Sequence, residues 1–267
     1  MKRWLFLAYG VAGYATFLAV YAYLAGFVGN FLVPKSIDAP ATGRTVQAVT
    51  INLLLVALFA VQHSVMARPA FKRVWTRLVP EPIERATYVW LANAATILLM
   101  WQWRPIGAVV WDAQQPVVRG MLWSLFAAGL LAVPLVSLLI SHFDLFGTRQ
   151  VWLFWRNKPY TNLPFRTPAV YAYVRHPLYL AWGLVFWAIP TMTLGHLLFA
   201  ASLTVYMMLA AIVEERDLVV HFGQSYEDYR HRVPMFVPRL SVATAVSQAT
   251  HESEPLAQPA GSKACDV

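Results

Sequence analysis

Charged residues are scarce in this chain, and cysteine is almost absent. Only 13% of the 267 residues are charged, whereas a typical soluble domain has about 25%. The single cysteine, Cys265, excludes a disulfide within the chain and a metal site built from cysteine. The sequence therefore lacks the charged surface of an ordinary soluble domain and any cysteine framework.

Apolar residues are abundant, at 58% of the chain, and they gather in six long blocks. About 18 or more consecutive apolar residues suffice to cross the hydrocarbon core of a bilayer. We therefore expect an all-α integral membrane protein, a bundle of about five to six transmembrane helices with short interfacial helices on the cytoplasmic side. The blocks cover residues 4–33, 45–67, 86–103, 120–141, 178–193 and 196–213.

The last two blocks are separated by only two residues. The fifth block is short and contains Pro190, and Gly195 precedes the sixth. Both helix breakers are tolerated in a membrane where neighbouring helices satisfy the freed backbone groups. The pattern predicts a tight hairpin of two helices. The first block is too long for the apolar region of a signal peptide, so it is expected to be a membrane helix.

The net charge of +8 is unevenly distributed along the chain. With a cytoplasmic N-terminus, the cytoplasmic segments hold 17 of the 21 Lys and Arg residues and the outer segments hold 4. Because basic residues concentrate on the cytoplasmic side, we expect both termini there, in a bacterial inner membrane. The basic residues do not alternate with aromatic residues on a polar face, so we expect no nucleic-acid binding. The expected surroundings are membrane lipids, and the sequence gives no sign of an obligate protein partner.

The chain divides into two parts by composition. Residues 1–240 are expected to form a single transmembrane domain. The segment from residue 241 to 267 is rich in small and polar residues and poor in aromatic residues. Such a segment buries too little apolar surface to fold, so we predict a disordered tail.

Two charged motifs flank the predicted hairpin. Arg175 and His176 directly precede Pro177, which suits the first turn of a helix. A helix N-terminus favours an anion, although Arg175 can also be interpreted as an anchor at the lipid interface. Glu214 and Glu215 follow the sixth block, where carboxylates oppose the dipole of an ending helix and call for a cation. A cleft that binds an anion at Arg175 and a cation at the two glutamates suits a zwitterion with an additional positive charge, such as S-adenosylmethionine.

These motifs resemble the C-terminal signature of isoprenylcysteine carboxyl methyltransferases and phospholipid methyltransferases. The resemblance covers roughly residues 170–240. It is carried by Arg175-His-Pro-Leu-Tyr179, Glu214-Glu215 and the stretch Phe222-Gly-Gln-Ser-Tyr-Glu-Asp-Tyr229 with Val233-Pro234. It implies that S-adenosylmethionine is the cofactor and S-adenosylhomocysteine the product. The resemblance implies a cofactor-binding part in residues 142–240, with Arg175, His176, Tyr179, Glu214 and Glu215 lining the cleft. Tyr173, two residues before Arg175, is a further candidate for this site.

The first 170 residues narrow the resemblance. Gln62-His63-Ser64 with Arg68, and His142-Phe-Asp144 with Arg149-Gln150, look like motifs of the bacterial methanethiol S-methyltransferases, within the wider NnrU-like group. That resemblance runs along nearly the whole chain. It implies methylation of a small volatile thiol, methanethiol to dimethyl sulfide, with hydrogen sulfide as a further candidate acceptor.

Methylation of a thiol requires a thiolate, which a nearby base or positive charge favours. The candidates are polar residues near predicted cytoplasmic helix ends, where titratable groups are functional suspects. Asp144 can orient His142 only if the chain leaves a regular helix between them. A polar contact between helices is the plainer interpretation of His63, and an interfacial anchor is as good an interpretation of Arg149. The predicted catalytic residues are His142, Asp144, Arg149 and His63.

No pair of histidines has the spacing of metal ligands, so no metal is expected. Two alternatives to thiol methylation stay open. One is a methyltransferase of the same superfamily that acts on a phospholipid amine or a prenylcysteine carboxylate. The other is a non-catalytic membrane protein of the NnrU type.

Overall fold

The structure is a computed structural model that describes residues 1–41, 43–161 and 163–238. The tail predicted to be disordered lies outside the described residues. Four of the described helices are long and apolar enough to cross a membrane: α1 (Lys2–Gly29), α2 (Thr45–Ala67), α5 (Pro116–Ile140) and α9 (Leu194–Phe222). The prediction of an all-α integral membrane protein is confirmed.

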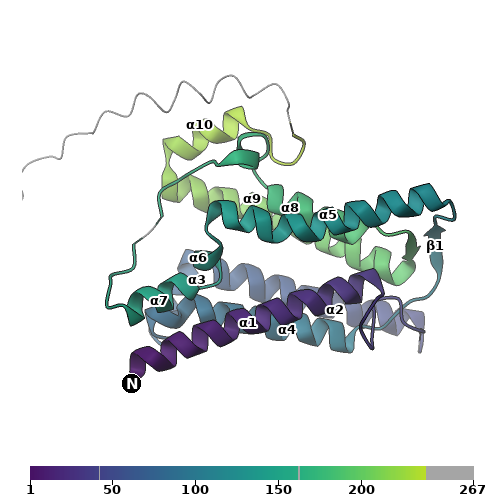
Figure 1. The fold of residues 1–267 in the computed structure, drawn as a ribbon, viewed down its shortest axis with the longest axis horizontal. Coiled ribbons are helices and arrows are strands. Elements are labelled where there is room, and N and C mark those ends of the chain that lie inside the picture. Colours follow the sequence, from purple (N-terminus) through teal and green to yellow (C-terminus); the bar gives the residue numbers. More distant parts are fainter. Residues whose placement is uncertain (42, 162, 239–267) are drawn as a thin grey trace, which may run out of the picture.

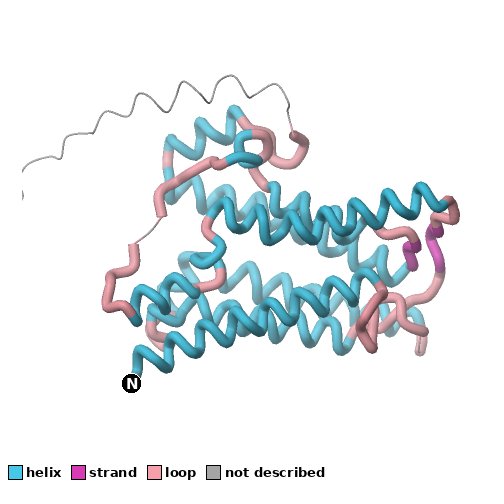
Figure 2. The backbone as a smooth tube through the Cα atoms, in the orientation of Figure 1, coloured by secondary structure: helices cyan, strands magenta, loops and turns pink. Residues whose placement is uncertain are grey.

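The remaining elements are shorter or carry more charge. Between the long helices lie α4 (Glu81–Gln102) and α8 (Pro177–Trp187). The short helices are α3 (Pro69–Trp75), α6 (His142–Leu145), α7 (Thr148–Trp155), η1 (Ala169–Ala172) and α10 (Gln224–Arg232). The two strands in the described residues are β1 (Val109–Asp112) and β2 (Thr191–Thr193). Figure 2 shows how little of the chain is strand.

The helices form two layers (Figure 1). One layer contains α1, α2 and α4, with α4 packed against both α1 and α2, and the other contains α5, α8 and α9. Contacts between α2 and α9 join the layers. The N-terminus and the short helices α3, α6, α7 and α10 lie at one end of the bundle, and the strands lie at the other. This arrangement places the motifs of α2, α6 and the α8–α9 hairpin at the same end.

The fifth apolar block is a shorter helix than its sequence predicts. The sequence predicts a helix over the apolar block at residues 178–193, but α8 ends at Trp187. Its 11 residues rise about 16 Å, roughly half of a hydrocarbon core of about 30 Å. The chain leaves the helix after Trp187, and β2 pairs antiparallel with β1 before α9 begins.

The sixth block is a longer helix than predicted. It was expected to end at residue 213, whereas α9 continues to Phe222 and ends at Gly223, whose φ of 58° favours glycine. The helix has 29 residues, about 43 Å, so its final turns extend beyond the hydrocarbon core. Glu214 and Glu215 therefore lie inside the helix. The unfavourable dipole expected from a helix end at that point does not arise.

A polar cluster fixes the end of the α8–α9 hairpin that lies beside the strands. Asp38 accepts hydrogen bonds from the Asn30 amide at 2.7 Å and from the Thr193 hydroxyl, and it contacts the buried ring of His196 at 3.3 Å. Burial acts to raise the pKa of Asp38, but the hydrogen bonds with His196 and Thr193 outweigh it and hold that pKa below its ordinary value. The loop before α2 is thereby attached to the start of α9.

Close packing between α5 and α8 depends on Gly129. A Cβ atom at this position would lie 2.9 Å from both the Ala181 carbonyl oxygen and the Leu184 Cβ atom. The main hydrophobic core lies between the two layers and includes the fully buried Phe27, Trp103 and Phe199. The core thus fills the half of the bundle nearer the strands and leaves the polar residues at the opposite end.

Candidate functional site

A buried ion pair joins the start of α8 to α9. The Arg175 guanidinium donates through Nε to Glu215 Oε1 at 2.7 Å and through Nη2 to Glu215 Oε2 at 3.2 Å. His176 Nε2 lies 3.0 Å from the same carboxylate. The side chains of Arg175 and Glu215 are only 10% and 6% exposed, so the pair is well shielded from water. The predicted proximity of the two hairpin motifs is confirmed.

Arg175 also attaches α10 to the hairpin. Its Nη1 donates to the carbonyl oxygens of Arg230 at 2.6 Å and Val233 at 2.5 Å. With the two bonds to Glu215, these contacts leave one of the five guanidinium N–H groups. The expected anion-binding arginine is therefore mainly a clamp between α8, α9 and α10, with limited remaining capacity for a ligand.

Glu214 has a different environment from its neighbour. Its Oε2 accepts one hydrogen bond, from the Tyr179 hydroxyl at 2.8 Å, and its side chain is half-buried. Among the residues that the structure describes, no ion pair includes Glu214, whereas Glu215 is paired twice. A partly buried carboxylate without a cationic partner favours a positively charged ligand, because desolvation of the charge is otherwise uncompensated.

Aromatic residues border this carboxylate. The ring of His176 stacks on Tyr179, with centroids 5.2 Å apart and an interplanar angle of 10°. Tyr173, half-buried, lies in the turn between η1 and α8. The structure therefore gathers five of the predicted cofactor-binding residues through direct contacts and places Tyr173 on the segment that leads into them.

The predicted contact between His142 and Asp144 does not form. The His142 ring lies between two hydroxyl groups, Tyr14 at 2.7 Å from Nε2 and Ser137 at 2.7 Å from Nδ1. His142 and Asp144 both belong to the short helix α6, where positions two apart do not face each other. His142 therefore joins α1 to the end of α5, and Asp144 points elsewhere.

Asp144 is the centre of a second ion-pair cluster. It accepts from Arg85 at 2.7 Å, from Arg149 at 3.1 Å, and from the Tyr160 hydroxyl at 3.1 Å and 3.2 Å. Arg149 also donates to the Thr161 carbonyl oxygen at 2.9 Å. These bonds connect α4, α6, α7 and the loop that follows. Arg85 and Tyr160 were not identified from the sequence; the position of Arg85 directly before the apolar block at residues 86–103 was the available signal.

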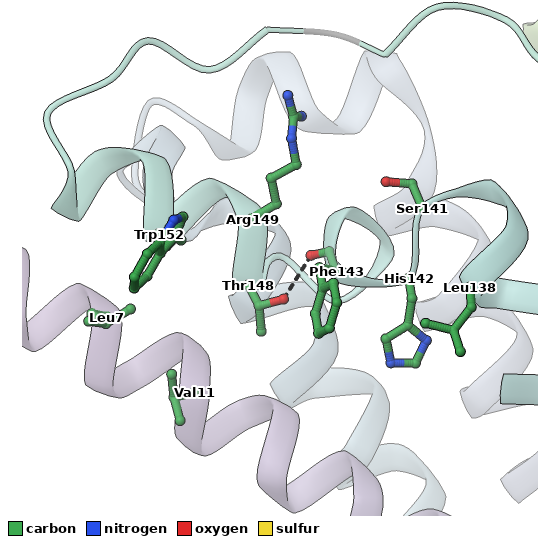
Figure 3. Close-up of a pocket in the computed structure, with 9 residues that line it drawn as sticks. All are labelled: Leu7, Val11, Leu138, Ser141, His142, Phe143, Thr148, Arg149 and Trp152. Carbon is green, nitrogen blue, oxygen red and sulfur yellow. Dashed lines mark hydrogen bonds between the residues drawn. The ribbon is translucent and has the colours of Figure 1, made fainter.

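A groove of about 540 Å³ opens beside α6 and α7. Figure 3 shows His142 and Phe143 on one side of it and Leu7 and Val11 of α1 on the other, while the Arg149 side chain is directed away from α1. None of the residues that line this groove belongs to α8 or α9. It is therefore a different site from the region around Glu214.

His63 lies apart from the other predicted catalytic residues. The hydroxyl oxygen of Tyr88, on α4, is 2.9 Å from both nitrogens of the His63 ring. Tyr88 was missed because a single tyrosine in an apolar helix carries no motif. The four predicted catalytic residues thus fall into two groups, His63 on α2 and the other three on α6 and α7. Among the described residues, no group of three or more His, Cys, Asp or Glu side chains is placed to hold a metal ion.

Comparison with known proteins gives close relatives. The chain is 51% identical over 238 residues to the methanethiol S-methyltransferase of Mycobacterium tuberculosis, covering 89% of this chain and 98% of that protein. It is 49% identical to the methanethiol S-methyltransferase of Crocosphaera subtropica, covering 89% and 93%. A more distant relative is Nurim of Danio rerio, 28% identical over 69% of this chain and 70% of that protein. No family model and no solved structure matches the chain.

Proposed function

Because the chain belongs to the family of the methanethiol S-methyltransferases, we propose that it is an enzyme that methylates methanethiol to dimethyl sulfide. The proposed methyl donor is S-adenosylmethionine, and S-adenosylhomocysteine is the second product. The observation that carries the cofactor site is the Glu214 carboxylate, partly buried, negatively charged and bonded to one phenol. Hydrogen sulfide is a further candidate acceptor.

The residues around Glu214 fit this donor. S-adenosylmethionine combines a sulfonium, an ammonium and a carboxylate. The Glu214 carboxylate matches a positive charge, and the remaining N–H group of Arg175 matches a carboxylate. The stacked rings of His176 and Tyr179 offer an aromatic face. We propose that Tyr173, Arg175, His176, Tyr179, Glu214 and Glu215 form the cofactor site.

Each residue has a separate task in this proposal. The bound donor supplies a methyl group that its positive sulfur makes electrophilic. Glu214 offsets that charge, and Tyr179 orients the carboxylate. Glu215 and Arg175 fix the start of α8 against α9 and hold α10 over it. We propose a positioning role for His142, Asp144 and Arg149, since their polar atoms are engaged with α1, α4 and α5.

The membrane topology follows from the distribution of charge. We propose a bacterial inner-membrane protein with both termini and the cofactor site on the cytoplasmic side, where 17 of the 21 Lys and Arg residues are expected. The charged donor then enters from the cytosol. The small apolar thiol dissolves in lipid and enters from the bilayer, and no protein partner is required.

An acceptor comparison tests the function. The purified protein in lipid nanodiscs is supplied with S-adenosylmethionine and, separately, with methanethiol, hydrogen sulfide or phosphatidylethanolamine. We expect dimethyl sulfide from methanethiol, measured by gas chromatography. Methylation of the lipid alone would replace the proposed substrate, and failure to bind S-adenosylhomocysteine in a calorimetric titration would contradict the methyltransferase function altogether.

A further inference from the structure

Three hydrogen-bonded pairs meet where α2, α4, α8 and α9 come together. The Tyr88 hydroxyl contacts the His63 ring at 2.9 Å, the Ser64 hydroxyl donates to Tyr206 at 3.2 Å, and the Tyr179 hydroxyl donates to Glu214 at 2.8 Å. Each pair joins two different helices: α4 with α2, α2 with α9, and α8 with α9. The three pairs together are called the tyrosine cluster below.

The three tyrosines of the cluster all lie within electrostatic range of the same carboxylate. Glu214 interacts electrostatically with Tyr88 and Tyr206 as well as with Tyr179. All six side chains are only half-buried, so each retains surface that a small molecule can contact. The cluster is therefore next to the carboxylate that we assign to the methyl donor, yet extends from it onto α2 and α4, which hold no part of the cofactor site.

The charges around the His63–Tyr88 pair come from three parts of the chain. Arg68 lies between α2 and α3, Arg85 on α4 and Glu214 on α9, and all three are within electrostatic range of Tyr88. Arg68 is paired with Asp217 of α9 at 2.9 Å, and Arg85 with Asp144 at 2.7 Å. Both arginines thus have carboxylate partners, and neither guanidinium is left unpaired beside the His63–Tyr88 pair.

Simple packing does not explain this composition. Polar side chains within membrane helices are costly and mark functional positions by default. The α2–α9 contact already has an apolar component in Phe59 and Tyr206, whose ring centroids are 6.1 Å apart, and a polar one in Arg68 and Asp217. The His63–Tyr88 pair adds a histidine beside Glu214, where α2 and α4 of one layer approach α9 of the other.

We propose that the part of the tyrosine cluster on α2 and α4, beside Glu214, is the thiol subsite, in which His63 accepts the thiol proton and Tyr88 positions the His63 ring. This assignment rests on the proposed function. The thiolate is the effective nucleophile, and a positioned base generates it at the point of use. An apolar wall from Phe59, stacked on His63 with centroids 5.2 Å apart, suits the methyl group of methanethiol.

The proposed reaction is a proton transfer followed by a methyl transfer. The S–H bond of the thiol breaks, its electron pair stays on sulfur, and the proton binds the lone pair of a His63 ring nitrogen. The thiolate sulfur then forms a bond to the methyl carbon while the bond from that carbon to the donor sulfonium breaks, its electron pair remaining on the donor sulfur. Two neutral thioethers result. The His63 imidazolium returns its proton to water at the cytoplasmic end.

Two variants with a matched control test the subsite. In His63→Gln the base is lost, and we expect kcat/KM for methanethiol to fall about 10²- to 10⁴-fold at pH 7. The variant then depends on thiolate from solution, so its kcat/KM is expected to rise about tenfold per pH unit until the thiol itself ionises. Tyr88→Phe is expected to lose about tenfold with unchanged pH dependence, since it retains the base. The control is Tyr9→Phe, because the Tyr9 hydroxyl donates to Thr87, which is outside the tyrosine cluster.

A binding measurement separates this inference from the proposed function. Calorimetric affinity for S-adenosylhomocysteine is expected to stay within about twofold in all three variants, which also reports folding. If the parent protein forms dimethyl sulfide but His63→Gln has the same pH profile and rate, the subsite assignment is wrong and the function stands. If the parent protein neither binds S-adenosylhomocysteine nor forms product, the proposed function fails first. Should His63→Gln not fold, an unaltered rate in Tyr88→Phe overturns the assignment.

Discussion

Glu215→Gln is expected to lower the melting temperature by about 10 °C and to abolish methyl transfer. The substitution leaves the Arg175 charge buried without its partner, which costs about 3–5 kcal/mol for a pair removed from water. Both side chains are 10% exposed or less. In a chain of this size each kcal/mol shifts the melting temperature by about 2–4 °C. Activity is lost because α10 and the start of α8 are held by the same arginine. Thermal unfolding in detergent measures the first effect.

The matched control for this prediction is Glu227→Gln. Glu227 pairs with Arg230 at 2.8 Å, three residues along α10, but the two side chains are 27% and 38% exposed. Exposed pairs contribute about 0–1 kcal/mol, so its melting temperature should stay within about 3 °C of the parent value. Equal losses in the two variants would show that the burial of the Arg175–Glu215 pair does not determine its contribution.

Glu214→Gln is expected to leave the fold intact and to weaken S-adenosylmethionine binding about 10- to 100-fold. The glutamine amide oxygen still accepts the Tyr179 hydrogen bond, but the negative charge is gone. Interactions with charged groups contribute about 1.5–3 kcal/mol, and each 1.4 kcal/mol is a factor of ten. S-adenosylhomocysteine has a neutral sulfur, so its affinity should fall less. Calorimetric titration with both ligands measures the difference.

The control for this variant removes a carboxylate elsewhere on the same side of the bundle. Glu81→Gln alters an exposed residue at the start of α4, and both affinities should match those of the parent protein. Equal weakening of the two ligands by Glu214→Gln would place the carboxylate beside a group that they share. Unchanged binding of both would remove Glu214 from the cofactor site.

The sequence predicted the membrane helices well where composition alone determines them. The blocks at residues 45–67 and 120–141 match α2 and α5 closely, because a run of apolar residues has few alternatives in lipid. The errors occurred where tertiary contacts decide. β2 forms because β1 offers it hydrogen bonds, and α9 continues past Glu214 because Glu215 has partners on the neighbouring α8 segment. Neither partner is visible in the local sequence.

The site was predictable to a similar degree. The motif around Arg175 and the paired glutamates identified the residues that meet at the α8–α9 hairpin, since their spacing is shared with a family. The different tasks of Glu214 and Glu215 were not predictable, because which carboxylate faces Arg175 depends on the rotation of α9 against α8. Tyr88 escaped notice for the same reason: its significance comes from contact with His63 across 25 residues of chain.

The most direct test of the account is an experimental structure of the protein with S-adenosylhomocysteine bound. We predict that its sulfur atom lies within about 6 Å of a Glu214 carboxylate oxygen, the range in which opposite charges interact strongly, and faces the His63–Tyr88 pair. A ligand seated instead in the groove between Leu7, Val11 and Trp152, with Glu214 remote from it, would contradict the account.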